Sequence, residues 1–219
     1  MKNLLFIIFY LSLFSCSLQN NNNLNEKYTA PISIESKLTE KESNIINAFI
    51  DVELKKDRYK NYKDCEIFVI EEALQKRKSL KTYIFSKDEW NSIHKMHGGK
   101  DRAEIYFLDT LQINKLELEL EKEEAYHWKV SDFKNLNVSL LKNEDLRTII
   151  KTTAYRNFSP RLIIYLSRPL IIDENNALIS FEVGAGQLGF HSLNHFTVLM
   201  RKENIKWVQI NLFYDGVFN

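Results

Sequence analysis

The sequence has no excess of charge of either sign and no long apolar run. Its 219 residues include 30 Lys and Arg against 29 Asp and Glu, so nothing draws the chain electrostatically to nucleic acid or to an anionic membrane surface. A helix that spans a bilayer needs about 20 apolar residues. Residues 4–14 are apolar except for Ser12, but this stretch is shorter than that. We therefore expect no nucleic-acid partner and no membrane-spanning helix from this stretch.

Motifs for several common chemistries are also missing. The chain contains no Gly-x-Ser-x-Gly around a serine nucleophile, no cysteine–histidine signature at Cys65 and no His-Glu-x-x-His of a zinc protease. Acidic residues are frequent, but they lie in charged runs such as 117–124, which are typical of a solvated surface. No pair of carboxylates stands out for glycoside hydrolysis. The sequence therefore gives no signature of a hydrolase.

The N-terminal residues predict export. Lys2 supplies a positive charge before the apolar stretch 4–14, as in secretory signal peptides. Leu13-Phe14-Ser15-Cys16 resembles the lipobox of bacterial lipoproteins. The resemblance implies that residues 1–15 are removed and that Cys16 is acylated, which makes the membrane a partner of the chain at ~0.8 kcal/mol per buried methylene. An ordinary cleaved signal with a chance cysteine is the alternative.

The segment 16–36 is expected to be a flexible tether. It contains four consecutive asparagines and few large apolar residues, so it cannot bury enough surface to offset the entropy of ordering. No acidic run follows Cys16, and the next residue is Ser17 rather than Asp; both favour an outer-membrane location that faces the periplasm. With Cys16 acylated, Cys65 is the remaining cysteine, so no internal disulfide is expected there.

Residues 37–219 are expected to form one α+β domain that begins with helices. Thr39-x-x-Glu42 has the spacing of a capping box, and apolar residues follow at helical spacing, which predicts a helix over 40–55. A second box at Ser86-x-x-Glu89 predicts a helix that ends at Gly98-Gly99. A short helix is expected over 143–153, with Asn143 as its cap.

The segments between these helices are harder to assign. Residues 103–111 are expected to be helical, and residues 128–141 to hold an edge strand. Leu and Glu alternate over 116–121, which indicates a half-buried strand, although the same residue types have good helix propensity. Residues 66–74 fit either a strand or a helix.

The C-terminal part predicts an antiparallel β-meander covered by the N-terminal helices. Apolar residues alternate with polar ones in segments that polar, turn-forming residues separate. The four expected strands cover residues 162–168, 177–183, 196–201 and 206–213.

A series of short motifs runs through the same part of the chain. It consists of Ser167-Arg168-Pro169, a strand that opens with Asn176-Ala177-Leu178, a glycine-containing loop, and Lys206-Trp207. The series resembles the C-terminal half of uncharacterised lipoproteins common in Bacteroidota, although Ile205 replaces their glycine and their loop cysteines are absent. It covers about a quarter of the chain and implies no activity. The closing strand also resembles NTF2-like domains, in which helices cover a curved sheet.

The glycine loop matches the sequence pattern of a nucleotide-binding motif but not the structural context that the motif requires. Residues 184–189 read Gly-x-Gly-x-x-Gly after a strand, but a dinucleotide-binding loop must lead into a helix. Residues 190–201 are typical of loop and strand instead. We interpret the loop as a hairpin connection and expect no cofactor.

Four histidines form the one candidate metal set. His94 and His97 fall on one helical face, and His191 and His195 are four residues apart, so together they could complete a tetrahedral zinc site, with an oxygen from Glu182 or Asp215. Trp90 and Ile93 share the helical face of His94 and His97. The alternative, which we favour, is that these two histidines pack against the protein and bind no metal.

Two hypotheses about function follow. The first is a binding or structural module whose sheet or loop contacts an envelope protein or a small ligand, with a site at Glu182, His191, Asn194 and His195. The second is a metal-assisted envelope hydrolase that uses the histidines. We expect any site to lie where this part of the meander meets the helix that carries His94.

Overall fold

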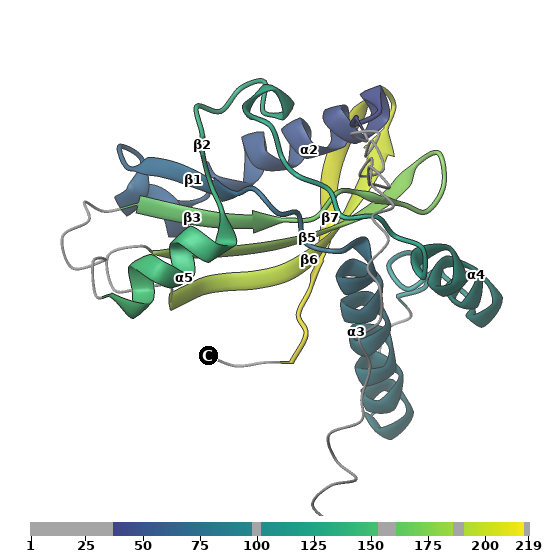
Figure 1. Cartoon of the computed structure of the whole chain (residues 1–219). Coiled ribbons are helices and arrows are strands. Elements are labelled where there is room, and N and C mark those ends of the chain that lie inside the picture. The colour runs from purple at the N-terminus through teal and green to yellow at the C-terminus, as the bar shows by residue number, and fades with distance from the viewer. Residues whose placement is uncertain (1–36, 98–101, 153–160, 186–190, 217–219) are drawn as a thin grey trace, which may run out of the picture. The chain divides into compact units, whose positions relative to one another are not determined.

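A seven-stranded mixed sheet forms the centre of the described structure, a computed structural model that covers residues 37–97, 102–152, 161–185 and 191–216. The side chains of Lys95, His97, Ala185, His191, Ser192 and Leu193 lie outside that description. The strand order is β2-β1-β3-β5-β6-β7, and β4 pairs with β5 beside this path (Figure 1). The strands are β1 Glu66–Ile70, β2 Ser139–Leu141, β3 Arg161–Leu166, β4 Leu170–Ile171, β5 Asn176–Ala185, β6 His191–Glu203 and β7 Lys206–Phe213.

The C-terminal strands confirm the expected meander. β3, β5, β6 and β7 pair antiparallel in that order, so the alternate residues of each strand point to opposite faces. The fold class is α+β, as the sequence predicted. Two strands from earlier in the chain extend the sheet, because β1 pairs in parallel with both β3 and β2. The parallel pairing of these two strands was not predicted.

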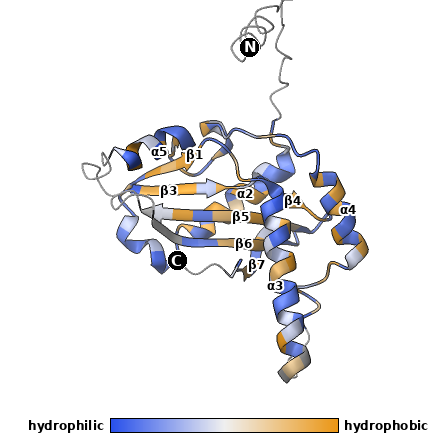
Figure 2. Ribbon diagram, turned by 60° about the horizontal axis from the view of Figure 1, so that its bottom comes forward, coloured by the Kyte–Doolittle hydropathy of each residue, from blue (hydrophilic) through white to orange (hydrophobic). Residues whose placement is uncertain are grey.

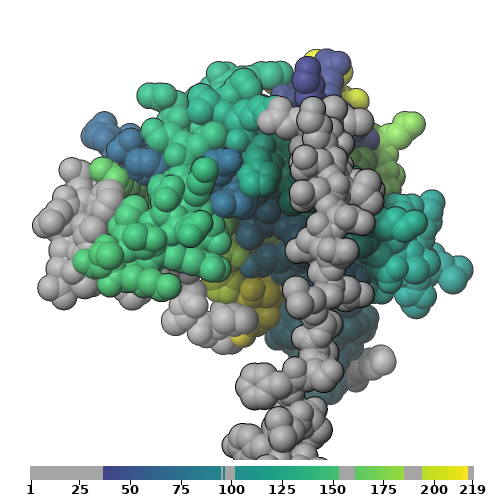
Figure 3. Space-filling model, viewed as in Figure 1, coloured from purple at the N-terminus to yellow at the C-terminus, as the bar shows by residue number. Residues whose placement is uncertain are grey.

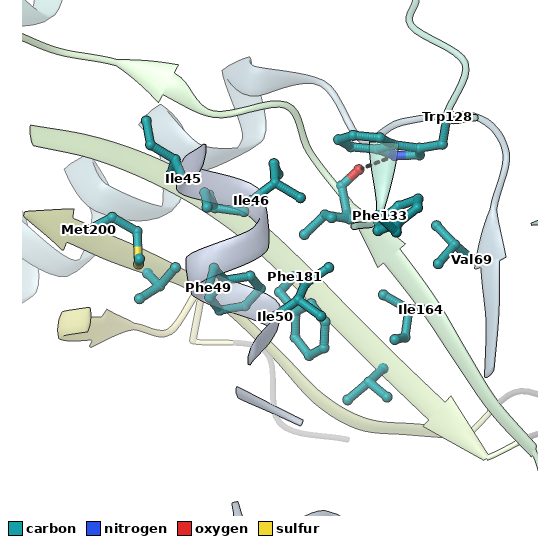
Figure 4. Close-up of a cluster of buried hydrophobic side chains, with 14 of the residues drawn as sticks. Ile45, Ile46, Phe49, Ile50, Val69, Trp128, Phe133, Ile164, Phe181 and Met200 are labelled. Carbon is teal, nitrogen blue, oxygen red and sulfur yellow. Dashed lines mark hydrogen bonds between the residues drawn. The ribbon is translucent and has the colours of Figure 1, made fainter. Parts of the chain in front are cut away.

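Helix α2, Glu40–Glu53, covers one face of the sheet. Thr39 and Glu42 form the predicted capping box, in which each residue's side chain accepts the other's backbone N–H. The apolar side of the helix packs against alternate residues of the central strands, and Phe49 meets Phe181 edge to face with ring centroids 5.2 Å apart. The Trp128 indole N–H closes this cluster by donating to the Leu166 carbonyl over 3.1 Å (Figure 4).

The opposite face carries three helices in two groups. Helix α3, Lys76–His97, and helix α4, Thr110–Leu120, cover one end of β5, β6 and β7 through an apolar cluster that includes Leu80, Tyr83 and Phe213. Helix α5, Asn143–Lys151, packs Leu146 on Ile70 and Ile163. Figure 2 shows that the C-terminal half of α3 extends beyond the sheet.

Several predicted elements are wrong in detail. Residues 116–120 belong to α4 rather than to a strand, and residues 103–109 form turns and an irregular stretch rather than a helix. Ser86 lies inside α3 instead of capping it, and its hydroxyl bonds the Tyr106 hydroxyl over 2.9 Å. Asn143 is the first residue of α5 and does not cap it, because its amide side chain bonds Tyr165 instead.

Two further assignments are confirmed, while the predicted signal peptide, the tether over 16–36 and most of the glycine loop lie outside the described residues. Residues 66–70 of the ambiguous segment form strand β1, and the expected edge strand is β2. Helix α3 ends at His97, directly before the two glycines, which lie outside the described residues.

Candidate ligand-binding site

The centre of the α3-side face carries a row of polar residues across three strands. Tyr165 of β3 is the register partner of Glu182 of β5, and Glu182 is the register partner of His195 of β6. Paired residues on neighbouring strands share a face, so the three side chains lie side by side. Asp215 extends the row beyond β7, with its Oδ1 3.1 Å from the His195 Nδ1. We call Tyr165, Glu182, His195 and Asp215 the polar row.

The polar row fills the interval between two apolar clusters. Along β5 the residues of this face read Leu178, Ser180 and Glu182, and only Leu178 belongs to the cluster under α3 and α4. Ile163 of β3 belongs to the separate cluster under α5. Figure 3 shows the yellow C-terminal segment between α5 and α3, where neither helix covers it. The sheet therefore exposes its polar residues where helix packing stops.

Buried hydroxyls separate the α3 cluster from the polar row. Ser180 Oγ lies 2.9 Å from both Ser79 Oγ and Thr197 Oγ1, and Ser167 Oγ accepts the Ser180 backbone N–H over 2.8 Å. All four residues are buried. Since these groups satisfy one another, they fix α3 on the sheet and hold Lys78 in place on the next position of the helix.

Side chains of α3 and α5 hold Glu182 and Tyr165. Lys78 Nζ donates to Glu182 Oε1, and the Tyr165 hydroxyl donates to Asn143 Oδ1 over 2.9 Å. Burial raises the pKa of the Tyr165 phenol, and the negative charge of Glu182 raises it further, whereas Arg147 lowers it. Tyr165 thus stays a neutral hydrogen-bonding group at physiological pH.

The segment after β7 positions Asp215 through a close approach to α3. Gly216 has φ +74°, a conformation that L side chains rarely adopt. A Cβ at this position would lie 2.6 Å from Phe85 Cζ, so the ring leaves no room for a side chain. Gly216 therefore lets the chain pass over Phe85 and carry Asp215 to His195.

A groove opens beside the row along the first turns of α3. It has a volume of about 420 Å³. The lining residues are Gln75, Arg77, Lys78, Lys81, Thr82, Phe85 and Asp215. Lys78 and Asp215 belong both to the groove and to the contacts of the polar row, which makes the two features one continuous site.

The four residues predicted as a ligand site do not all meet. Glu182 and His195 are direct partners, as above. Asn194 points to the opposite face, where it hydrogen-bonds the Tyr59 phenol under α2, because neighbouring residues of a strand face opposite ways. His191 begins β6, and its side chain is outside the described structure.

The metal set is spread over the fold. His94 is exposed on α3, with its ring 5.9 Å from that of Trp90. It follows Lys78 by sixteen residues, which places it ~24 Å farther along the helix axis. No group of three His, Cys, Asp or Glu residues that could hold a metal ion occurs among the described residues. The side chains of His97 and His191 lie outside the described structure.

The sequence did not single out Tyr165 or Lys78. Tyr165 was one aromatic residue of an apolar strand, and Lys78 was one of many lysines. Both become recognisable only through Glu182, because each reaches it from an element distant in the chain.

A larger hollow of about 700 Å³ lies elsewhere, between α2 and the β6–β7 turn. Its charged lining is mixed and mostly exposed, with Lys41, Lys202 and Lys206 facing Glu40, Asp51 and Glu174. Lys41 covers the Trp207 ring at 5.8 Å. We favour the polar row as the site because its ionisable groups are partly buried and held by specific partners.

The fold and site together describe an α+β protein with an open polar strip on one face of its sheet. Comparisons with known proteins add no name to this description: no family model, no curated protein and no solved structure matches the chain. Within the described residues, no helix is long and apolar enough to cross a membrane. The predicted likeness to NTF2-like domains stays a prediction.

Proposed function

We propose that the protein is a lipid-anchored binding module of the bacterial cell envelope, and that the polar row binds a small polar ligand. The observation that carries the proposal is the in-register alignment of Tyr165, Glu182 and His195 on the sheet face between α3 and α5, where the three side chains are partly exposed. Apolar residues would stabilise this centre of the sheet better than ionisable groups. Partly buried polar groups that converge on a concave surface are typical of ligand sites.

A thermal-shift screen tests the binding proposal. The probes are amino acids, hydroxy acids, sugar phosphates and monosaccharides, each added at millimolar concentration to the purified full chain. We expect at least one solute to raise the melting temperature of the wild type and to lose this effect in Tyr165→Phe/Glu182→Gln. A matched control, Asn44→Ala/Asp51→Ala in the larger hollow, keeps the shift. The proposal fails if no solute acts, or if the first variant responds like the wild type.

The membrane anchor is a separate part of the proposal. Its support is the sequence: Lys2, the apolar residues 4–14, and Leu13 to Cys16 in the lipobox pattern. The lipid would hold the chain at the outer membrane, on the side that faces the periplasm. Cell fractionation checks it. Wild type should sediment with membranes and Cys16→Ser should not, whereas Cys65→Ser should behave as wild type. A Cys16→Ser chain that stays in the membrane fraction rules the anchor out.

One observation favours a hydrolase as the second candidate. The Asp215 carboxylate lies at the His195 Nδ1, an arrangement that fixes the ring and leaves Nε2 as the nitrogen that can exchange a proton with a substrate. Ester and phosphoester substrates would test it. Turnover that His195→Gln abolishes would favour this candidate over simple binding.

A further inference from the structure

The groove beside the polar row presents one face of α3 to solvent. Lys78, Lys81, Thr82 and Phe85 follow the i, i+3, i+4, i+7 spacing and all line the groove. Asp215 closes it from the C-terminal segment. The floor is thus a single rigid helix, and its chemistry depends on a few side chains at fixed spacing.

Positive charge dominates this lining. It holds three cationic side chains, those of Arg77, Lys78 and Lys81, against one carboxylate, that of Asp215. Lys78 is paired with Glu182, and Asp215 lies against His195. Arg77 and Lys81 have no acidic partner among the residues that the structure describes. The groove therefore holds two cations whose charge no neighbouring group balances.

The Thr82 hydroxyl is a second and independent sign of a ligand. Thr82 is 5% exposed and lines the groove. A helical threonine commonly donates to the carbonyl four residues earlier, as Thr148 does to Glu144 over 3.0 Å. Thr82 has no hydrogen-bond partner within the described parts of the chain. Its hydroxyl oxygen is not fully enclosed by the protein, so it is open to a hydrogen bond with a molecule in the groove that Thr82 lines.

The terminus of α3 is not itself the site. Both carboxylate oxygens of Glu123 already accept its first backbone N–H groups, those of Lys76 and Arg77, over 2.7 and 3.2 Å. An anion in the groove would instead contact side chains of the first two turns, on the flank of the helix. The charge and the hydroxyl that point to a ligand are therefore available on the helix flank.

We propose that this groove binds an oxyanion, a phosphate or carboxylate group, of the ligand that the polar row accepts. Arg77 and Lys81 supply the opposing charge, and the Thr82 hydroxyl donates a hydrogen bond. The inference rests on the proposed function and narrows its ligand to a small acidic molecule. The carboxylates of Glu182 and Asp215 suit a hydrogen-bond donor on the same molecule, a few ångströms from its acidic group.

Calorimetric titration of the full chain with inorganic phosphate tests the proposal, with sodium chloride at equal ionic strength as reference. We expect saturable binding that weakens by about tenfold or more in Arg77→Gln/Lys81→Gln, since charge-assisted hydrogen bonds are lost. Thr82→Val should also weaken phosphate binding, whereas Thr82→Ser, which keeps the hydroxyl, should bind phosphate as the wild type does. The control Lys41→Gln/Lys206→Gln removes two charges from the larger hollow and should bind as wild type. Equal phosphate affinity in all variants overturns the proposal, as does an equal loss in the control.

A second arm distinguishes a free solute from a lipid headgroup. The probe is vesicles of phosphatidylglycerol and phosphatidylcholine, added to the full chain with Cys16→Ser so that no acyl chain carries it. Co-sedimentation that phosphate inhibits and Arg77→Gln/Lys81→Gln abolishes supports an anionic headgroup. Phosphate binding without co-sedimentation supports a soluble acid. If neither phosphate binding nor vesicle binding depends on Arg77, Lys81 or Thr82, the oxyanion site is contradicted.

The two proposals fail in different ways. If a solute stabilises the protein through Tyr165 and Glu182, but Arg77→Gln/Lys81→Gln leaves both that effect and phosphate affinity unchanged, the oxyanion site is wrong and the binding module stands. If neither set of variants changes any response, both proposals are wrong.

Discussion

At the scale of single residues, buried charge is stabilised by paired hydrogen bonds. Glu42 is 5% exposed, and its carboxylate accepts from Arg168 Nε over 3.0 Å and from Arg168 Nη2 over 2.9 Å. Burial by itself would raise the pKa of Glu42, but Arg168 and the Thr39 amide outweigh it, and the pKa falls below the ordinary value of 4.5. The same carboxylate therefore caps α2 and ties it to the end of β3.

This arrangement predicts a pH dependence of stability. We expect Glu42→Gln to lower the free energy of unfolding at pH 7 by about 1.5–3 kcal/mol, the range for hydrogen bonds to charged groups. Because the pKa of Glu42 is depressed in the folded state, its contribution is complete above pH 4.5 and is lost as the pH falls through the folded pKa. Urea unfolding from pH 7 to pH 3 measures it. The gap between wild type and variant should shrink with acid, whereas Glu40→Gln, at an exposed position of the same turn, should show no such gap.

The buried hydroxyl network makes a second prediction. Ser180→Ala removes the group that bonds both Ser79 and Thr197. We expect it to lower the free energy of unfolding by about 1–3 kcal/mol, because it leaves buried hydroxyls with fewer partners. Chemical denaturation measures the change. Ser92→Ala, at an exposed site of α3, is the control and should stay within about 0.5 kcal/mol of wild type. An equal effect of the two substitutions would contradict the network.

Sequence reasoning named three residues of the polar row, Glu182, His195 and Asp215, and missed Tyr165. Glu182 and His195 stood out because they flank the glycine loop, and the pairing of β5 and β6 brings them together. Asn194 lies on the opposite face from Glu182 and His195, and closeness in sequence does not fix which face of a strand a residue takes. Tyr165, Lys78 and Thr82 depend on contacts between elements far apart in the chain, which no local pattern encodes.

At the scale of elements, tertiary packing decided the ambiguous segments. Leu116 and Leu120 of α4 are four residues apart and buried against the α3 cluster, whereas Leu118 is 65% exposed. Strand alternation would have buried all three, so helical packing explains the error in the expected strand. Asp109 and Gln112 form a capping box that starts this helix, and this was the local signal that the sequence offered.

The sheet predicts a gradient of protection from solvent exchange. β5 is ten residues long and pairs with β6 on one side and with β3 and β4 on the other, whereas β2 is a three-residue edge strand that, among the described strands, pairs only with β1. We expect amide hydrogens of residues 178–182 to exchange orders of magnitude more slowly than those of residues 139–141. Hydrogen–deuterium exchange with mass spectrometry measures both segments. Similar rates in the two would show that β5 is not the centre of the sheet.

At the scale of the whole domain, the sequence predicted the antiparallel half of the sheet and not the parallel half. Polar, turn-type residues separate β4 from β5 and β6 from β7 in the sequence, so these antiparallel pairings follow from local patterns. β1 reaches β3 only after about ninety residues of intervening chain. Such a crossover depends on the apolar faces that α2 and α5 supply, and these cannot be read from β1 alone.

The two faces of the sheet thus have different roles in the domain. The α2 face carries one apolar cluster that runs from β1 to β7. The α3 face has two apolar clusters with the polar row between them. The α2 face provides most of the core. We propose that the protein binds its ligand at the polar row, between the two apolar clusters of the α3 face.

Chemical-shift mapping tests this central claim most directly. The solute that gives the largest thermal shift is titrated into isotope-labelled protein, and backbone and histidine signals are followed by two-dimensional NMR. The polar row predicts that the largest changes fall on Lys78, Glu182, His195 and Asp215. Changes confined to Lys41, Lys202 and Trp207 around the larger hollow, or no localised changes at saturation, would contradict it.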